Sequence, residues 1–170
     1  MKQDMKKLLA ETFLLLLTLT VSAQEPWGIT ASDIDASNYF GATVANGQIG
    51  LTSAAEPLRN ATVVVGGCYD GDAKSSIPSF FDNIHMMDMT LKIDGETAAI
   101  GNISGYSQRL DMRKAQMTAN FSLGKKAEVS YRQMALRQLP FSAMTIVEVK
   151  AKSDITLEAT NEHVCPSNLQ

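Results

Sequence analysis

Apolar and polar residues alternate with a period of two through most of residues 87–159, and no other feature limits the possible folds as strongly. Successive side chains of a β-strand point to opposite faces of the sheet, so this period predicts strands with one buried and one solvated face. The apolar face comprises Met87, Met89, Leu91 and Ile93 in the first clear segment, and Ala115, Met117, Ala119, Phe121 and Leu123 in the second.

Turn residues separate these segments. Asp94-Gly95 predicts a tight hairpin, with residues 97–100 returning as the partner strand, because glycine tolerates positive φ. Residues 124–126 form the next turn, after which the apolar alternation resumes. It slips by one position at Gln133–Met134, and a one-residue slip predicts a β-bulge there.

Further strands are predicted over residues 61–66, 141–151 and from 155 onward, whereas residues 24–40 have no regular pattern. The total is about six to eight short strands with no amphipathic helix, which indicates an all-β sandwich or barrel. A polar, solvated face on each strand favours antiparallel pairing. Residues 162–170 are polar and are expected to follow the last strand.

The first 23 residues have the pattern of a signal peptide. Lysines precede a short apolar run from Phe13 to Val21, and Val21-Ser22-Ala23 offers small residues to a signal peptidase. The run is shorter than the roughly 20 apolar residues of a spanning helix. We therefore expect an exported, periplasmic or extracellular protein with no membrane segment after cleavage; the alternative is an uncleaved anchor. The predicted organisation is a signal peptide (1–23), an irregular lead-in (24–40) and a β-sandwich domain (41–170).

Composition excludes several function classes. The formal net charge is −3, whereas binding nucleic acid needs a basic face. Export permits a disulfide, but nothing in the sequence brings Cys68 and Cys165 together, and two unpaired thiols are favoured. With His85 and His163 they show no metal-ligand spacing. The sequence assigns no catalytic, cofactor-binding or metal-binding residue, and predicts no cofactor.

Several short motifs recur in one order along the chain. The first is the glycine-rich segment Ala45-Asn46-Gly47-Gln48-Ile49-Gly50. The others are Gly66-Gly67-Cys68-Tyr69-Asp70, Ile77-Pro78-Ser79, Lys92-Ile93-Asp94-Gly95, Tyr106 to Arg113 with its Leu-Asp-x-Arg motif, and Arg132 to Leu136. Together, and in this order, they resemble the N-terminal part of glycoside hydrolase family 65, whose signature there is Gly-Asn-Gly-Tyr-Ile-Gly. The family includes maltose, trehalose and kojibiose phosphorylases and acid trehalases.

The resemblance implies a galactose mutarotase-like supersandwich, here incomplete at its C-terminal end, that precedes an (α/α)6 catalytic barrel absent from this chain. The catalytic glutamate of such enzymes lies in the barrel, so no catalytic residue is carried over. Leu110, Asp111 and Arg113 are interpreted as structural, with Asp111 and Arg113 on one strand face as an ion pair or a turn-locking network. Ala45 and Leu51-Thr52 depart from the phosphorylase pattern and favour a secreted hydrolase branch.

Three functions remain open at this point. In the first, the chain is an accessory domain of a family 65-like α-glucoside hydrolase or phosphorylase. The partners of the chain are then an α-glucoside and the catalytic barrel. Alternatively it is a stand-alone carbohydrate-binding sandwich, for which Trp27, Tyr39 and Phe80-Phe81 are the candidate sugar contacts. The third function is a structural or partner-binding module.

Overall fold

The computed structural model describes residues 27–70, 79–80 and 85–164, and these residues form thirteen β-strands. The described part contains no helix, and so none long and apolar enough to cross a membrane. The predicted signal peptide and Cys165 lie outside the described residues. The strands are β1 (Gly28–Ala31), β2 (Thr43–Ala45), β3 (Ile49–Ser53), β4 (Asn60–Val65), β5 (Tyr69–Asp70), β6 (Ser79–Phe80), β7 (His85–Ile93), β8 (Glu96–Thr97), β9 (Ile103–Asp111), β10 (Gln116–Leu123), β11 (Ala127–Ala135), β12 (Ala143–Ala151) and β13 (Leu157–Val164).

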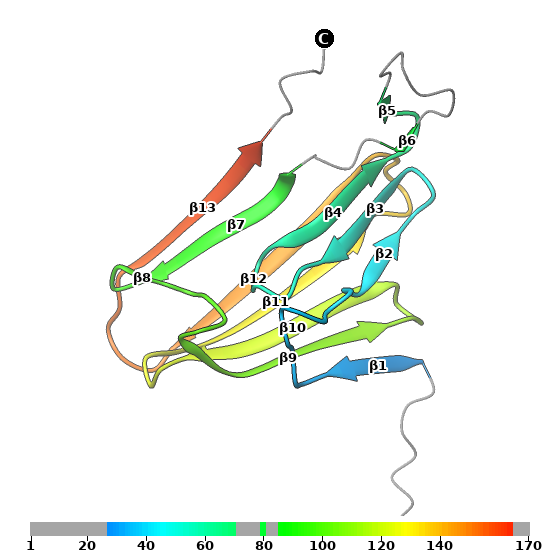
Figure 1. The fold of residues 1–170 in the computed structure, drawn as a ribbon. Helices are drawn as coiled ribbons and strands as arrows, with labels where there is room; N and C mark the ends of the chain where they lie inside the picture. The colour runs from blue at the N-terminus through cyan, green and yellow to red at the C-terminus, as the bar shows by residue number, and fades with distance from the viewer. Residues whose placement is uncertain (1–26, 71–78, 81–84, 165–170) are drawn as a thin grey trace, which may run out of the picture.

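One layer is a five-stranded antiparallel sheet in the order β1-β9-β10-β11-β12 (Figure 1). Strands β9 to β12 follow one another along the chain and pair as successive hairpins. Strand β1 joins the sheet from far away in the sequence, with Ile29 opposite Leu110.

The other layer consists of two three-stranded sheets, β13-β7-β8 and β2-β3-β4, which lie side by side (Figure 1). They meet at the start of β4, where the Met89 N–H donates to the Leu58 carbonyl at 3.0 Å. The Asn60 N–H donates to the Asp88 carboxylate at 2.9 Å at the same junction. None of the sheets closes on itself, so the fold is the antiparallel β-sandwich that the sequence predicts rather than a barrel.

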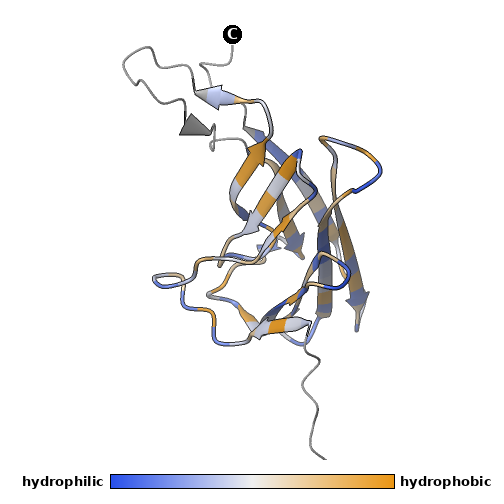
Figure 2. Cartoon of the chain, turned by 90° about the vertical axis from the view of Figure 1, so that its right-hand side faces the viewer, coloured by the Kyte–Doolittle hydropathy of each residue, from blue (hydrophilic) through white to orange (hydrophobic). Residues whose placement is uncertain are grey.

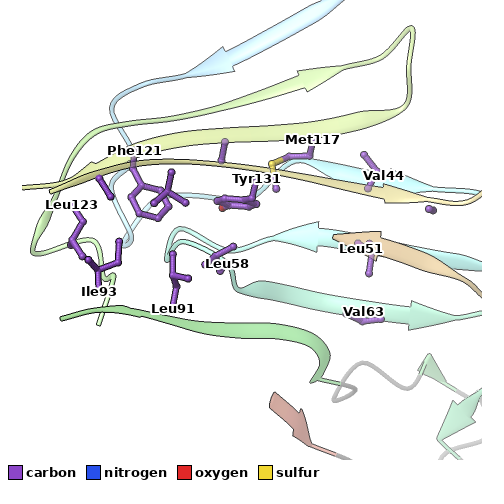
Figure 3. Close-up of a cluster of buried hydrophobic side chains, with 14 of the residues drawn as sticks. Val44, Leu51, Leu58, Val63, Leu91, Ile93, Met117, Phe121, Leu123 and Tyr131 are labelled. Atoms are coloured by element: carbon purple, nitrogen blue, oxygen red, sulfur yellow. The ribbon is translucent and has the colours of Figure 1, made fainter. Parts of the chain in front are cut away.

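The core lies between the layers, where inward side chains of both sheets meet (Figure 3). Strands β10 and β11 contribute every second residue, as the period of two predicts, and Figure 2 shows the alternation of hydrophobic and hydrophilic residues along the strands. Each fully buried large apolar side chain contributes roughly 1.5–3 kcal/mol through burial. The large buried side chains of the core include Tyr131, Phe121, Leu51, Leu58, Leu91, Ile93, Met117 and Leu123.

The predicted hairpin at Asp94-Gly95 is confirmed. Both residues have positive φ, 52° and 80°, as a two-residue turn with the twist of the flanking strands requires. The bounds predicted for the returning strand, residues 97–100, are wrong, because β8 comprises only Glu96 and Thr97, with Glu96 paired with Ile93, and residues 98–100 are not in a strand.

The prediction that residues 24–40 are wholly irregular is wrong, because residues 28–31 form β1. Four residues are too few to show a period of two. Their strand conformation comes from the edge of β9, which offers backbone hydrogen-bonding groups to a distant segment.

The predicted bulge at Gln133–Met134 is also wrong. Strand β11 runs through both residues without a register shift, and Gln133 points inward with 1% of its surface exposed. Its side-chain amide donates to Thr145 Oγ1 at 3.4 Å, so this polar side chain has a partner at an inward position. The irregularity of this sheet falls instead between β9 and β10, at Asn120/Ser122.

Strand β13 extends to Val164, three residues into the segment expected to follow the last strand. It pairs with β7 along one edge, and no described strand pairs with its other edge. Leu157 at its start is 48% exposed. Strand β12 is the corresponding open edge of the five-stranded sheet.

Candidate functional site

The glycine-rich segment at 45–50 is a turn that clamps the two layers together. The Asn46 carboxamide oxygen accepts the N–H groups of Gln48 and Ile49, both at 2.9 Å, and Gly47 between them has φ 90°. The Asn46 side-chain amide donates to the carbonyl of Leu136 in the opposite layer at 2.7 Å. This segment, which carries the clearest motif of the sequence, therefore positions backbone and exposes no reactive group.

The Leu-Asp-x-Arg segment closes the β9–β10 hairpin. The Asp111 carboxylate accepts the N–H groups of Arg113 and Lys114, each at 3.0 Å, and these bonds lower the pKa of Asp111. The turn-locking interpretation agrees with this geometry. The placement of Asp111 and Arg113 on one strand face does not, because β9 ends at Asp111 and Arg113 lies in the turn.

A buried polar cluster centred on Gln108 joins the layers, and the sequence analysis missed it. The Gln108 carboxamide oxygen accepts the hydroxyls of Tyr39 and Ser53, the latter at 2.9 Å. Its side-chain amide donates to the Ala54 carbonyl at 2.9 Å and to the Tyr106 hydroxyl at 2.6 Å. Burial raises the pKa of Tyr106, so its hydroxyl stays protonated. The cluster connects β9 with β3 and with the segment before β2.

A second polar cluster holds β13 against β7 and β4. Arg59 contacts both carboxylate oxygens of Glu162, with its Nη2 3.0 Å from Oε1, and Thr90 donates to the same carboxylate. The Asp88 carboxylate is 3.7 Å from the Arg59 guanidinium. The hydrogen bonds from Arg59 and Thr90 lower the pKa of Glu162 from 4.5 to about 2.

This cluster predicts that acid loosens β13. A carboxylate with a lowered folded-state pKa stabilises the fold above its unfolded pKa, here 4.5, and that contribution is lost as the pH falls towards 2. We expect Glu162→Gln to flatten the dependence of the urea midpoint on pH across this window. Glu158→Gln, at an exposed position of the same strand, is the matched control. Equal slopes for the Glu162 variant and the unmodified chain would contradict the assignment.

A shallow groove of about 570 Å³ lies on the outer face of the five-stranded sheet. Strand pairing places Asn120 opposite Ser130 and Ser130 opposite Glu148, so these three side chains form one row across β10, β11 and β12. Ser122, Glu128 and Lys150 form the neighbouring row in the same way.

Both carboxylates of the groove are ion-paired with basic side chains. Glu128 lies 2.6 Å from the Lys152 ammonium and 3.9 Å from that of Lys150, and both lower its pKa. The general acid of a glycosidase needs the opposite shift, a raised pKa, so Glu128 does not suit that role. Glu148 is 3.1 Å from Arg132 Nη2. The groove therefore offers polar groups to a ligand, and its two carboxylates are held in ion pairs.

The structure describes the side chains of two of the four aromatic residues considered as sugar contacts, Trp27 and Tyr39. Trp27 is 56% exposed beside β1, and the Tyr39 hydroxyl is engaged by Gln108. Phe81 lies outside the described residues.

Cys68 is half-buried at the margin of the core. Within the described ranges no three His, Cys, Asp or Glu side chains are placed to hold a metal ion.

The fold and these clusters define the chain as an antiparallel β-sandwich whose polar side chains chiefly fix turns, edges and the junction of its layers. No family model matches the chain. It is, however, 38% identical over 147 residues to a kojibiose hydrolase of Flavobacterium johnsoniae. It is 36% identical over 155 residues to a kojibiose hydrolase of Mucilaginibacter mallensis.

These alignments cover 86% and 91% of this chain but only 22% and 23% of the two relatives. The chain thus spans less than a quarter of the curated relatives it matches. At this level of identity the matched part of each relative is a homologue of this sandwich, which agrees in part with the resemblance seen in the sequence.

Proposed function

We propose that this chain is the N-terminal accessory β-sandwich of an exported, family 65-like enzyme that hydrolyses an α-glucoside, with the catalytic groups on another part of the polypeptide. One observation carries the proposal: the chain aligns almost throughout with kojibiose hydrolases and yet corresponds to under a quarter of their length. Its function is then to support a catalytic barrel.

The roles of the motif residues support this proposal. Asn46 and Asp111, from the two clearest motifs, are occupied in holding backbone. A scaffold needs such residues, whereas an active site leaves its polar groups available to substrate. No described strand pairs with the outer edges of β12 and β13, so these edges offer backbone groups on which another part of an enzyme can pack.

Hydrolysis is favoured over phosphorolysis by two independent features. Both relatives are kojibiose hydrolases, and Ala45 and Leu51-Thr52 depart from the phosphorylase pattern. The signal-peptide pattern of residues 1–23 supports export. An α-linked glucobiose is therefore the substrate class for which this sandwich is proposed to serve.

A chimera tests the proposal. The segment of the Flavobacterium johnsoniae enzyme that aligns with this chain is replaced by the corresponding residues of this chain. We expect kcat/KM for kojibiose to stay within about tenfold of the parent, a loss of at most about 1.4 kcal/mol in transition-state stabilisation. A chimera carrying an unrelated β-sandwich of similar length is the control and is expected to be inactive.

An activity assay of the chain without a catalytic domain is the second test of the proposal. Purified chain incubated with kojibiose is expected to release no glucose, because both groove carboxylates are ion-paired with basic side chains. Turnover by the chain alone, or a folded chimera without activity, would overturn the accessory role.

A further inference from the structure

The groove on the outer face of the five-stranded sheet contains polar side chains that the fold does not use. The side chains of Asn120, Ser122 and Ser130 make no hydrogen bond to any other described residue. This contrasts with Asn46, Gln108 and Asp111, whose side chains all make hydrogen bonds within the fold. An amide and two hydroxyls on adjacent strands thus present both donors and acceptors to the groove.

The charged side chains that flank these polar groups form ion pairs with one another. Glu128 is paired with Lys150 and Lys152, and Glu148 with Arg132. An anionic ligand would have to compete with Glu128 for the lysines, and a cationic ligand would have to compete with the lysines for Glu128. The groove therefore favours an uncharged ligand that binds through hydrogen bonds.

The floor of the groove is hollowed where β9 and β10 lose register. Gly105 lines it with φ 62°, and a Cβ at this position would meet nothing within 4 Å. The volume of about 570 Å³ lies within the range of small-ligand sites. Neighbouring strands are about 4.8 Å apart, close to the length of one pyranose unit, so the row Asn120–Ser130–Glu148 can contact successive sugar rings.

We propose that this groove is a non-catalytic binding site for a neutral oligosaccharide of α-linked glucose, with Asn120 and Ser130 as its central hydrogen-bonding residues. The choice of glucose rests on the proposed function, whereas the preference for a neutral, polyhydroxylated ligand rests on the groove. Because the face is open and its aromatic lining residue, Phe121, is buried with its ring packed edge-on against Tyr106, affinity is expected to be in the millimolar range, about −4 kcal/mol.

Titration of the isotope-labelled chain with kojibiose, followed by amide chemical shifts, tests the site. We expect saturable shifts confined to the backbone amides of the groove-lining residues on β9, β10, β11 and β12. Asn120→Ala is expected to raise Kd by about three- to tenfold through loss of its hydrogen bonds. Thr118→Ala is the matched control, because Thr118 lies on the same face of β10 two residues away and does not line the groove.

The outcomes separate this site from the proposed function. No saturation, shifts elsewhere, an unchanged Kd for Asn120→Ala, or equal shifts with glucose 6-phosphate would each overturn the site. An active chimera with no kojibiose binding by the groove leaves the accessory role standing and removes only the site. Binding at the groove together with an inactive chimera removes the accessory role and keeps the site.

Discussion

Replacing Tyr131 with alanine is expected to lower the free energy of unfolding by about 3–5 kcal/mol, as truncation of a large buried aromatic side chain does. Tyr131 is 1% exposed and lies between the layers, facing Leu58 and Met117 (Figure 3). Alanine would leave a cavity that strands on both sides cannot close, because each is fixed by its own hydrogen-bond ladder. A loss of this size is a large fraction of the stability of a small domain.

Tyr131→Phe separates packing from hydrogen bonding. It keeps the ring but removes the hydroxyl that lies 3.2 Å from the Tyr106 hydroxyl, so the expected loss is about 1 kcal/mol. Lys125→Ala, in the exposed turn between β10 and β11, should change stability by no more than about 0.5 kcal/mol. Urea unfolding with a common m-value measures all three. Similar midpoints for the alanine and phenylalanine variants would contradict a packed central position for Tyr131.

The sequence predicts the central strands well because their burial alternates strictly. In β10 and β11 every inward residue is more buried than its neighbours, so the period of two survives in the amino-acid sequence. The Asp94-Gly95 turn is predictable for a local reason, namely that few residue pairs tolerate two positive φ angles.

Features that depend on distant partners are not visible in the same way. Strand β1 is set by pairing with β9, about 80 residues away, and the supposed bulge at Gln133 was an inward polar residue whose partner lies on β12. The open edge of β13 likewise depends on the fact that no described strand pairs with it. A periodic sequence pattern indicates which residues are buried, but it does not identify the residues or strands that bury them.

The residues of the candidate site likewise differ in whether their roles depend on local sequence or on distant partners. Asn46 and Asp111 stand in recognisable turn motifs, so their structural roles could be anticipated. Gln108 could have been noticed as the polar residue between Tyr106 and Leu110 on an inward face, but its partners Tyr39 and Ser53 could not. The groove requires the register of three strands, which only the paired structure supplies.

Gln108→Leu is expected to lower the free energy of unfolding by about 2–5 kcal/mol, because it removes a partner from several buried groups at once. Leucine fills a similar volume, so little of the effect comes from a cavity. The hydroxyls of Tyr39 and Ser53 and the carbonyl of Ala54 would each lose the bond that Gln108 makes to them. Urea unfolding measures the loss, and Ser53→Ala, which removes one of these partners, should cost about 1 kcal/mol.

Gln108→Glu keeps the shape of the side chain but replaces its amide with a carboxyl group. Its effect on the free energy of unfolding therefore depends on pH. Gln108 is 2% exposed, so a carboxyl there favours its neutral form and has a raised pKa. A raised carboxyl pKa means that the folded state binds more protons than the unfolded state above about pH 4.3, and stability then falls as the pH rises. This is the opposite sign to the contribution of Glu162. If the leucine and glutamate variants unfold at the urea midpoint of the unmodified chain at neutral pH, the four bonds of Gln108 contribute nothing to joining the layers.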